Sequence, residues 1–232
     1  MLSIDMDIPI VIIAFNNYTY VKNMVNQLID KNIKNIHIID NNSSYPNLLK
    51  YYEINKDLFT LHSMNKNYGH RVLFKNENRA LYDSLPNYFI LTDPDIQINP
   101  NIPNNFIEKM IDISEKYKVG KVGLALDISE HEKFRNITFT RFNKKKSIYQ
   151  WEQQFWTNQL EDKIYLASVD TTFAVHNKKY FVIGNKESII LKGIRMAGDF
   201  TSKHLPWYKE TIVPNEEIAY YNSKSSCSFW GY

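Results

Sequence analysis

The sequence has a single cysteine, Cys227, and no apolar stretch approaching the ~20 residues that a bilayer-spanning helix needs. A lone cysteine cannot form an internal disulfide, so nothing in the chain indicates secretion. The apolar run from Ile8 to Phe15 is too short and too early for a signal peptide, and Asp5 and Asp7 precede it. We therefore expect a cytoplasmic protein that is at most peripheral to a membrane.

Glycine is also scarce, with seven residues in the whole chain. No Gly-x-Gly-x-x-Gly follows the first apolar run, and no Gly-x-x-x-x-Gly-Lys occurs anywhere. These absences argue against a nicotinamide-dependent dehydrogenase and against a P-loop enzyme. A phosphate ligand would have to be held by a metal ion and by side chains.

The chain lacks a strong excess of charge of either sign. Its 28 basic and 25 acidic residues give a formal net charge of +3, and 44% of the residues are hydrophobic. This is the composition of an ordinary globular protein, and we expect no nucleic-acid partner. The longest basic run, residues 144–146, is interpreted as a solvated loop.

The first half of the chain alternates between apolar runs and amphipathic stretches. Apolar runs predict strands at 9–15, 36–40, 58–63, 88–93 and 121–126. Helical spacing predicts helices at about 18–31, from Pro46 onward, at about 72–84 and at about 107–114. Because parallel strands need crossover connections, this alternation predicts an α/β fold with a mostly parallel central sheet flanked by helices.

The second half has weaker periodicity. Residues 127–163 mix charges with aromatic side chains, residues 168–176 resemble a strand, and residues 194–208 follow a connection that contains lysine and glycine. No internal repeat or linker is visible. We therefore predict one domain for residues 1–232.

Polar clusters follow three of the predicted strands, at residues 15–17, 40–44 and 93–95. The carboxyl ends of parallel strands meet at one edge of a sheet, where ligands of such folds bind. In the last cluster, Pro94 separates Asp93 from Asp95. Two neighbouring carboxylates raise each other's pKa unless a cation neutralises them, and Mg²⁺ and Mn²⁺ prefer such oxygen ligands. The alternative is that the two acids form only a turn with the residues that follow them.

The strings IPIVIIAFNN, HIIDNNSS, NKNYG and FILTDPD together resemble the nucleotide-sugar-binding half of a GT-A glycosyltransferase of family 2. The resemblance covers about residues 8–111 and keeps the family's order of motifs, ending in the DxD motif. It implies a nucleotide-sugar-binding half at about 1–126 and an acceptor-binding half at about 127–232.

The resemblance also implies roles for residues of the first half. Ala14, Phe15 and Asn16 would face the base, Asp40 would bind the uracil or ribose, and Asn67 and Gly69 would lie near the nucleotide. Asp93 and Asp95 would bind the diphosphate through Mn²⁺ or Mg²⁺. The family usually has small residues after its Asn-x-Gly, whereas this chain has His70 and Arg71. Arg71 is expected either to contact phosphate or to cap the following helix.

GT-A enzymes often supply a histidine near the C-terminus as a further metal ligand, and His204 in KHLPWY is the corresponding candidate. Imidazole is an acceptable ligand for Mn²⁺. A structural histidine is the alternative for His204. Among the other histidines, His176 is the main competitor, and His62, His70 and His131 are weaker ones.

Transfer of a sugar with inversion needs a base that takes the proton of the acceptor hydroxyl. Asp170, in SVDTTFAVH, is the leading candidate, and Glu152 and Asp199 are alternates. Asp170 could instead be a turn residue that accepts from the amides of Thr171 and Thr172.

Tryptophan side chains stack well on the apolar faces of sugars, so Trp151, Trp156 and Trp207 are candidate acceptor contacts. Packing of these rings against the sheet is the alternative.

We therefore expect a metal-dependent glycosyltransferase that moves a sugar from a nucleoside-diphosphate sugar, a UDP-sugar by preference, to a hydroxyl acceptor, with inversion. The acceptor would be a glycan, a lipid-linked molecule or a protein. A catalytically silent carbohydrate- or nucleotide-binding module and a sugar-phosphate nucleotidyltransferase remain alternatives. The oligomeric state stays open.

Overall fold

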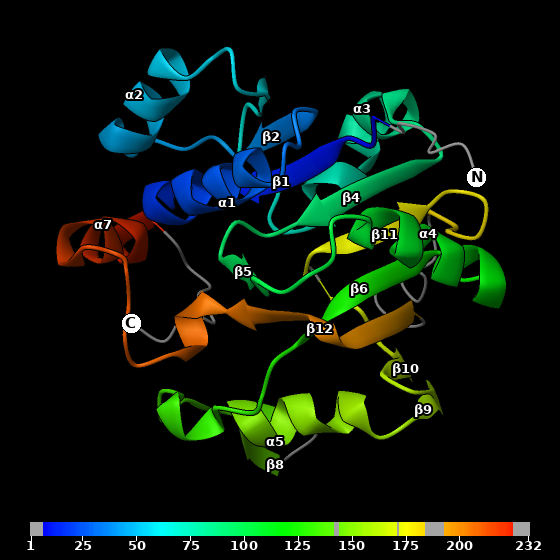
Figure 1. Ribbon diagram of the computed structural model, residues 1–232. Helices are drawn as coiled ribbons and strands as arrows, with labels where there is room; N and C mark the ends of the chain where they lie inside the picture. The colour runs from blue at the N-terminus through cyan, green and yellow to red at the C-terminus, as the bar shows by residue number, and fades with distance from the viewer. Residues whose placement is uncertain (1–6, 142–143, 171, 184–192, 225–232) are drawn as a thin grey trace.

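A ten-stranded sheet forms the centre of the computed structural model, which describes residues 7–141, 144–170, 172–183 and 193–224 (Figure 1). Its strand order is β3-β2-β1-β4-β11-β6-β12-β10-β9, and β5 pairs with β12 beside this path. The strands are β1 Ile10–Ala14, β2 Ile36–Asp40, β3 Thr60–Ser63, β4 Tyr88–Thr92, β5 Ile96–Ile98, β6 Lys121–Leu126, β9 Gln159–Glu161, β10 Ile164–Ala167, β11 Ala174–Asn177 and β12 Gly193–His204. Cys227 lies outside the described residues.

Most strands of this sheet run in one direction. β3, β2, β1 and β4 are parallel neighbours. β11 runs against both β4 and β6, so β6 shares the direction of β4, and β12 is parallel to β6. The strands β5 and β10 run against β12. The prediction of a mostly parallel sheet flanked by helices is confirmed.

Helices cover both faces of the sheet. The main core cluster joins one face to three amphipathic helices, α1 Tyr18–Asp30, α2 Pro46–Ile54 and α4 Phe106–Tyr117. A second cluster joins the other face to the 3-10 turn η1 Val72–Phe74 and the short helix α3 Arg79–Ser84. The 3-10 turn η2 Asn76–Asn78 connects these two elements and has no buried residue. β1 contributes Ile10 and Ile12 to the first cluster and Val11 and Ile13 to the second. This double burial is why its sequence is continuously apolar.

The second half adds smaller elements around β12. They are η3 His131–Lys133, the hairpin strands β7 Thr138–Arg141 and β8 Lys144–Ser147, α5 Ile148–Glu152, η4 Gln153–Trp156, η5 Leu205–Trp207 and α7 Asn215–Lys224. In Figure 1, α5 and β8 lie at the end of the molecule beyond β12, and α7 lies beside α1. Among the described residues, no helix combines the length and apolar content that crossing a bilayer requires.

Three local predictions were wrong. Residues 72–84 do not form one helix, because Lys75 has extended backbone angles and the Asn78 side chain donates to the carbonyl of Val72 over 2.9 Å. In the run 144–146, Lys144 and Lys145 are exposed and Lys146 is half-buried, and the run forms part of strand β8 and not a loop. The strand predicted at 168–176 begins only at Ala174.

His176 on β11 is a buried titratable group with aromatic neighbours. Its ring stacks on Phe89 at 4.9 Å between centroids and contacts Phe74 and Phe181, and its Nδ1 is buried without a hydrogen bond. Burial lowers the pKa of His176 well below its ordinary value, and the positive charge of Lys121 adds to this effect. His176 is therefore neutral in the folded protein at physiological pH.

Replacing His176 by phenylalanine should reduce the acid sensitivity of the fold. Because the folded-state pKa is depressed, the unfolded chain binds more protons below about pH 6.5, and wild-type stability falls there by about 1.4 kcal/mol per pH unit for this proton. His176→Phe should have a correspondingly flatter profile between pH 6.5 and 5 in urea unfolding experiments. Phe181→Leu, which disturbs the same aromatic cluster without removing a titratable group, is the control and should keep the wild-type slope; equal slopes in all three proteins would contradict the prediction.

Candidate active site

The register of the parallel strands brings the predicted polar clusters to one edge. Ala14 at the end of β1 lies opposite Asp40 at the end of β2, and Ile12 lies opposite Thr92 at the end of β4. The backbone amide of Asn41 donates to the Ala14 carbonyl over 2.8 Å, which continues the β1–β2 ladder beyond the strands. The three strand ends therefore form one polar edge, named here the donor edge.

Asn16 builds the first loop of the donor edge. It is buried and has a left-handed backbone with φ of 51°, a conformation that asparagine tolerates better than most residues. Its Oδ1 accepts from the backbone amides of Ser44 and Tyr45 at 2.7 and 2.9 Å, and its own amide donates to the Ser43 hydroxyl over 2.9 Å. One side chain thus connects the loop after β1 to the loop after β2.

Asp40 fixes the second loop. It is buried, its Oδ2 accepts from the amide of Ser43 at 2.9 Å, and its Oδ1 accepts from the hydroxyl of Tyr52 at 3.2 Å. The negative charge and burial raise the pKa of Tyr52 well above its ordinary value, with burial the larger cause. Both carboxylate oxygens therefore have partners within the fold.

The loop after β3 is attached to the same edge through Asn41. The Asn41 side chain accepts from the amide of Tyr68 and donates to the carbonyl of Gly69, both at 3.2 Å. Gly69 has φ of +78°, and its amide donates to the exposed Asn67 over 2.7 Å. Asn67 and Gly69 are thereby positioned beside the β2 loop.

Asp95 and His204 meet because β5 pairs with the end of β12. His204 lies opposite Ile96 in this antiparallel register, and the amide of Leu205 donates to the Asp95 carbonyl over 2.9 Å. The side chains approach with Asp95 Oδ2 3.4 Å from His204 Nε2. Residues more than 100 positions apart in the sequence therefore share one site.

Both side chains of this pair are shielded from water, with 3% of Asp95 and 18% of His204 exposed. Burial raises the pKa of the Asp95 carboxyl, and the neighbouring His204 opposes that rise. Burial lowers the pKa of His204, while the charges of Asp95 and Asp170 act in the opposite direction. The influence of Asp170 shows that it lies within electrostatic range of the pair.

The Asp95–His204 pair offers the kinds of ligand atoms, a carboxylate oxygen and an imidazole nitrogen, that a divalent metal ion binds. Two ligands about 2.1 Å from an octahedral ion lie about 3 Å apart, close to the 3.4 Å seen here. Asp95 Oδ1 is also buried without a hydrogen bond. No third His, Cys, Asp or Glu within the described part of the chain joins them in a ligand cluster. The pair therefore fits an ion that takes its remaining ligands from water and from a substrate.

The half-buried Asp93 stands on the same loop, just before Pro94. Its negative charge raises the pKa of Lys121, against the larger lowering effect of burial. Asp93 therefore lies within electrostatic range of Lys121 on β6, while Asp95 contacts His204 on β12.

The three candidate bases occupy different environments. Asp170 is exposed, and its carbonyl accepts from the amide of Thr172 over 2.7 Å in a turn that precedes β11. Glu152 is 2% exposed and forms an ion pair with the equally buried Arg195. Asp199 is exposed in a bulge of β12, where the register with β6 shifts between Met196 and Thr201. Only Asp170 is both accessible and electrostatically coupled to His204.

The three candidate tryptophans lie on two separate parts of the fold. Trp207 in η5 packs against His204 with ring centroids 4.8 Å apart, which places it beside the Asp95–His204 pair. Trp151 on α5 contacts Phe139 and Phe155, and Trp156 contacts Tyr165. Trp151 and Trp156 therefore belong to the segment that lies over β10.

A model of the family described as Glycosyl transferase family 2 matches residues 10–181. The chain belongs to glycosyl transferase family 2. No curated protein sequence matches the chain.

Among solved structures, GalNAc-T7 with UDP, GalNAc and Mn²⁺ aligns with this family 2 chain at a TM-score of 0.53 and 13% identity, over 88% of this chain and 44% of that one. TarS 1-349 of S. aureus aligns at a TM-score of 0.42 and 13% identity, over 79% of this chain and 53% of that one. The chain thus spans about half the length of these structures. The first likeness shows the GT-A fold.

The remaining histidines of this family 2 chain have other surroundings. His62 forms a 3.0 Å contact with His37 on the neighbouring strand, His131 stacks on Tyr149, and His176 lies among phenylalanines. His70 keeps much of its ring surface exposed; the part that the protein covers lowers its pKa, and the charge of Asp170 acts in the opposite direction. His204 is the histidine that contacts Asp95.

Arg71 stands at the N-terminal boundary of η1, and its side chain makes no capping hydrogen bond there. One of the two interpretations of Arg71, a capping role, is therefore not seen. Its positive charge lowers the pKa of His70 and of Lys121.

Sequence reasoning missed the contribution of α7 to the donor edge. Glu217 accepts from the amide and hydroxyl of Thr19 at 2.9 and 2.6 Å. Tyr220 donates to the carbonyl of Ser44 over 2.8 Å, and Tyr221 makes an edge contact with Phe15 at 6.2 Å. Its helical stretch has a weak apolar pattern, so the one available signal was the dense Tyr and Glu content of residues 215–224.

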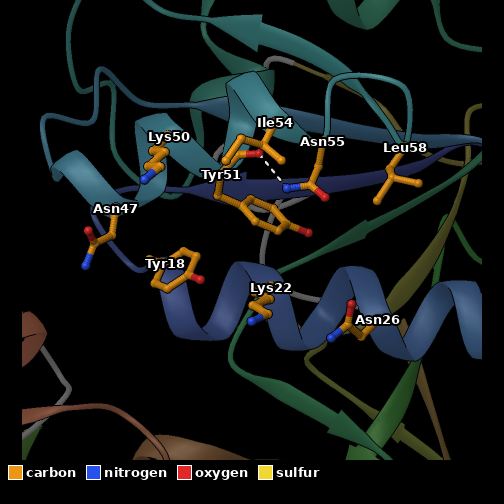
Figure 2. A pocket seen from close by; sticks show the side chains of 9 residues that line it. All are labelled: Tyr18, Lys22, Asn26, Asn47, Lys50, Tyr51, Ile54, Asn55 and Leu58. Atoms are coloured by element: carbon orange, nitrogen blue, oxygen red, sulfur yellow. Dashed lines mark hydrogen bonds between the residues drawn. The ribbon is translucent and has the colours of Figure 1, made fainter.

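A separate groove of about 520 Å³ lies between α1 and α2 (Figure 2). It contains two lysines and no carboxylate, and the Tyr51 hydroxyl within it is buried, which raises the pKa of Tyr51 to about 12. The lining residues are Tyr18, Lys22, Asn26, Asn47, Lys50, Tyr51, Ile54, Asn55 and Leu58. Neither Asp40 nor Asp95 lines it, so this groove is distinct from the donor edge.

Replacing Asn16 by alanine should destabilise the protein, because the amides of Ser44 and Tyr45 lose their acceptor in a shielded environment. We expect a loss of about 2–4 kcal/mol in the free energy of unfolding, measured in urea. Asn42→Ala is the matched control, since Asn42 has a similar φ of 62° but is exposed; it should cost only about 1 kcal/mol of backbone strain. Equal losses would show that the hydrogen bonds of Asn16 contribute nothing.

Proposed function

We propose that this chain is a metal-dependent glycosyltransferase that moves a sugar from a UDP-sugar to a hydroxyl acceptor with inversion. The observation that supports this most directly is the approach of His204 to Asp95 of the DxD motif at the donor edge. The pairing requires two distant segments of the sequence to converge on one buried acid. Membership of glycosyl transferase family 2 supports the same reaction class.

Mn²⁺ or Mg²⁺ fits the Asp95–His204 pair, whose two side chains would hold it directly. Asp93 of the same loop is proposed as a further acid near the ion and the diphosphate. When bound, such an ion acts as a Lewis acid on the diphosphate leaving group. The chain contributes two features of its own. The β5–β12 ladder fixes the separation of Asp95 and His204, and the buried environment keeps bulk water from competing for the ligand atoms. GalNAc-T7, which shares the fold, was crystallised with UDP and Mn²⁺.

The nucleoside would lie along the loops after β1, β2 and β3. Phe15 is half-buried beside Tyr221 of α7 and offers an aromatic surface next to Ala14 for the base. The side chains of Asn16 and Asp40 already form hydrogen bonds within the loops, so we propose that these two residues hold the loops in shape. Asn67 and Gly69 would lie next to the nucleotide. Among these four residues only Asn67 is exposed, so Asn67 is the proposed contact near the nucleotide, while Asp40 would support the loop that faces the uracil or ribose. Arg71 is the proposed contact to phosphate.

Asp170 is the proposed base. In an inverting transfer the acceptor oxygen attacks the anomeric carbon, the bond to the diphosphate oxygen breaks, and the hydroxyl proton passes to a carboxylate on the acceptor side. Asp170 is exposed and lies within electrostatic range of His204, so it can face the same substrate as the metal ligands. Glu152 is already paired with Arg195, and Asp199 lies in the β12 bulge, so both are weaker choices.

The acceptor would lie between η5 and the α5–η4 segment, with Trp207, Trp151 and Trp156 as aromatic contacts. Trp207 is half-buried against His204 and could present its remaining surface to a sugar ring next to the reaction centre. Residues 1–126 would then form the donor half and residues 127–232 the acceptor half. The acceptor class is a glycan, a lipid-linked molecule or a protein that carries a free hydroxyl.

Asp95→Asn should keep the fold and lose metal-dependent nucleotide binding. The amide cannot supply the negative charge that a divalent ion requires, so in titration calorimetry the affinity for UDP in Mn²⁺ should fall by at least about tenfold, which corresponds to about 1.4 kcal/mol. Binding in EDTA should not change. The exposed Asp57→Asn is the control and should behave as wild type. Full Mn²⁺-stimulated UDP binding in Asp95→Asn would refute the site.

Asp170→Asn should bind the donor normally and lose transfer. The amide keeps the size of the side chain but cannot take a proton, and we expect kcat to fall by about 10²- to 10⁴-fold. The measurement is release of UDP from a panel of UDP-sugars with candidate acceptors. Unchanged turnover would transfer the role of base to Glu152 or Asp199, and UDP binding without turnover of any donor in the wild type would favour a silent binding module.

A further inference from the structure

Two buried cations contact the backbone just before Asp170. The ammonium group of Lys121, on β6, donates to the carbonyl of Val169, and Arg195 Nε, on β12, donates to the carbonyl of Ser168 over 2.8 Å. Lys121 is 6% and Arg195 3% exposed. Burying a charge is strongly unfavourable unless the charge is well partnered, so such a pair calls for a specific explanation.

Two glycines make room for the same segment. A Cβ added to Gly123 on β6 would lie 2.6 Å from Val169 Cγ1, and one added to Gly193 on β12 would lie 2.7 Å from Val169 Cγ2. Real Cβ atoms do not approach other atoms this closely. Val169 is 1% exposed, so its side chain fills the space that the absence of two Cβ atoms leaves.

The register of the sheet shows that these contacts lie on one face. Gly123 lies opposite Arg195 in the parallel β6–β12 pair. Lys121 precedes Gly123 by two residues and Gly193 precedes Arg195 by two, so all four side-chain positions point to the same side. That face of the sheet therefore presents two cationic side chains and two glycines to the segment 168–170.

Arg195 also extends the arrangement to the acceptor side. Its guanidinium group pairs with Glu152 of α5 and lies 4.2 Å from the centre of the Phe155 ring of η4. One buried side chain thus contacts both the segment that carries the candidate base and the segment that carries Trp151 and Trp156.

We propose that Lys121 and Arg195 are positioning residues that, with Gly123 and Gly193, seat Val169 and so fix where Asp170 meets the acceptor hydroxyl. This proposal rests on the proposed role of Asp170 as the base. An error of about 1 Å in the place of a reacting group can cost about 10²-fold in rate, which explains why an exposed turn residue would be anchored so heavily. It also assigns Glu152 a role through Arg195, in aligning the acceptor segment, and not in the proton transfer.

The proposal can be tested by adding a methyl group that pushes on Val169 and then removing the atom that it would meet. Gly123→Ala should displace Val169 and lower kcat about 10- to 100-fold, with the affinity for UDP and Mn²⁺ unchanged. Val169→Ala removes the Cγ1 atom that the new methyl group would meet, so Gly123→Ala/Val169→Ala should recover most of the lost kcat. Gly120→Ala is the matched control: its Cβ would lie 2.8 Å from Phe181 and not from Val169, so it should lower stability and leave kcat near wild type.

A second measurement separates positioning from general damage. In an Asp170→Asn background, Gly123→Ala should cause little further loss of kcat, because the group that it misplaces is already inactive. Lys121→Met, which removes the donor to the Val169 carbonyl and keeps a similar length, should show the same dependence on Asp170. If Gly123→Ala does not fold, Lys121→Met still tests the proposed positioning.

The outcomes distinguish a wrong choice of base from a wrong account of how that base is positioned. Full turnover of Asp170→Asn would overturn the assignment of the base and this inference with it. An inactive Asp170→Asn together with a fully active Gly123→Ala and Lys121→Met would overturn the positioning alone. An equal loss of kcat from Gly123→Ala in both backgrounds, or no recovery in the double variant, would also overturn it.

Discussion

The hydrogen-bond ladder along β12 is the constraint on which the site depends. The first residues of this strand pair with β6 and β10, and its last three pair with β5. The first part brings Arg195 beneath the segment that precedes Asp170, and the last part brings His204 to Asp95. A single strand of 12 residues thus connects the proposed metal site, the proposed base and the acceptor segment.

A bulge divides β12 into the part that carries Arg195 and the part that carries His204. Four residues, 197–200, are inserted between the partners of Leu124 and Ala125, with Gly198 at φ of +69°. After the bulge, Thr201 and Ser202 pair again with β6, and Ser202 to His204 also pair with β5. Asp199 lies in this insertion, which explains why a residue close in sequence to His204 is not part of the proposed site.

Elements that are buried on both faces could be predicted from the sequence. β1, β2, β4 and β6 are short apolar runs, and their parallel order brings Ala14, Asp40 and Asp93 to one edge as expected. The pairing of β5 with β12 could not be predicted, because Ile96–Ile98 is only three residues long and its partner lies about 100 residues away. The helix expected at 72–84 failed for a local reason, since the Asn78 side chain competes for a backbone carbonyl.

The chemistry of the site residues was harder to predict than their place. Asp40, Asn16 and Glu152 are polar residues of suitable type, yet each is buried and occupied by partners within the fold. Composition and spacing do not distinguish a side chain that builds a loop from one that contacts a ligand. Lys121 and Arg195 had no sequence signal, because a lone cation inside an apolar run looks like an ordinary strand residue.

The contact of α7 with the donor edge has a consequence for how the chain reaches its native state. Thr19 and Glu217 are 198 positions apart, and Tyr220 bonds to Ser44 across 176. Bringing residues so far apart into contact closes most of the chain into one loop, which costs conformational entropy. A nascent or truncated chain that ends before residue 215 lacks these contacts and presents the surface around Phe15 without the cover of α7.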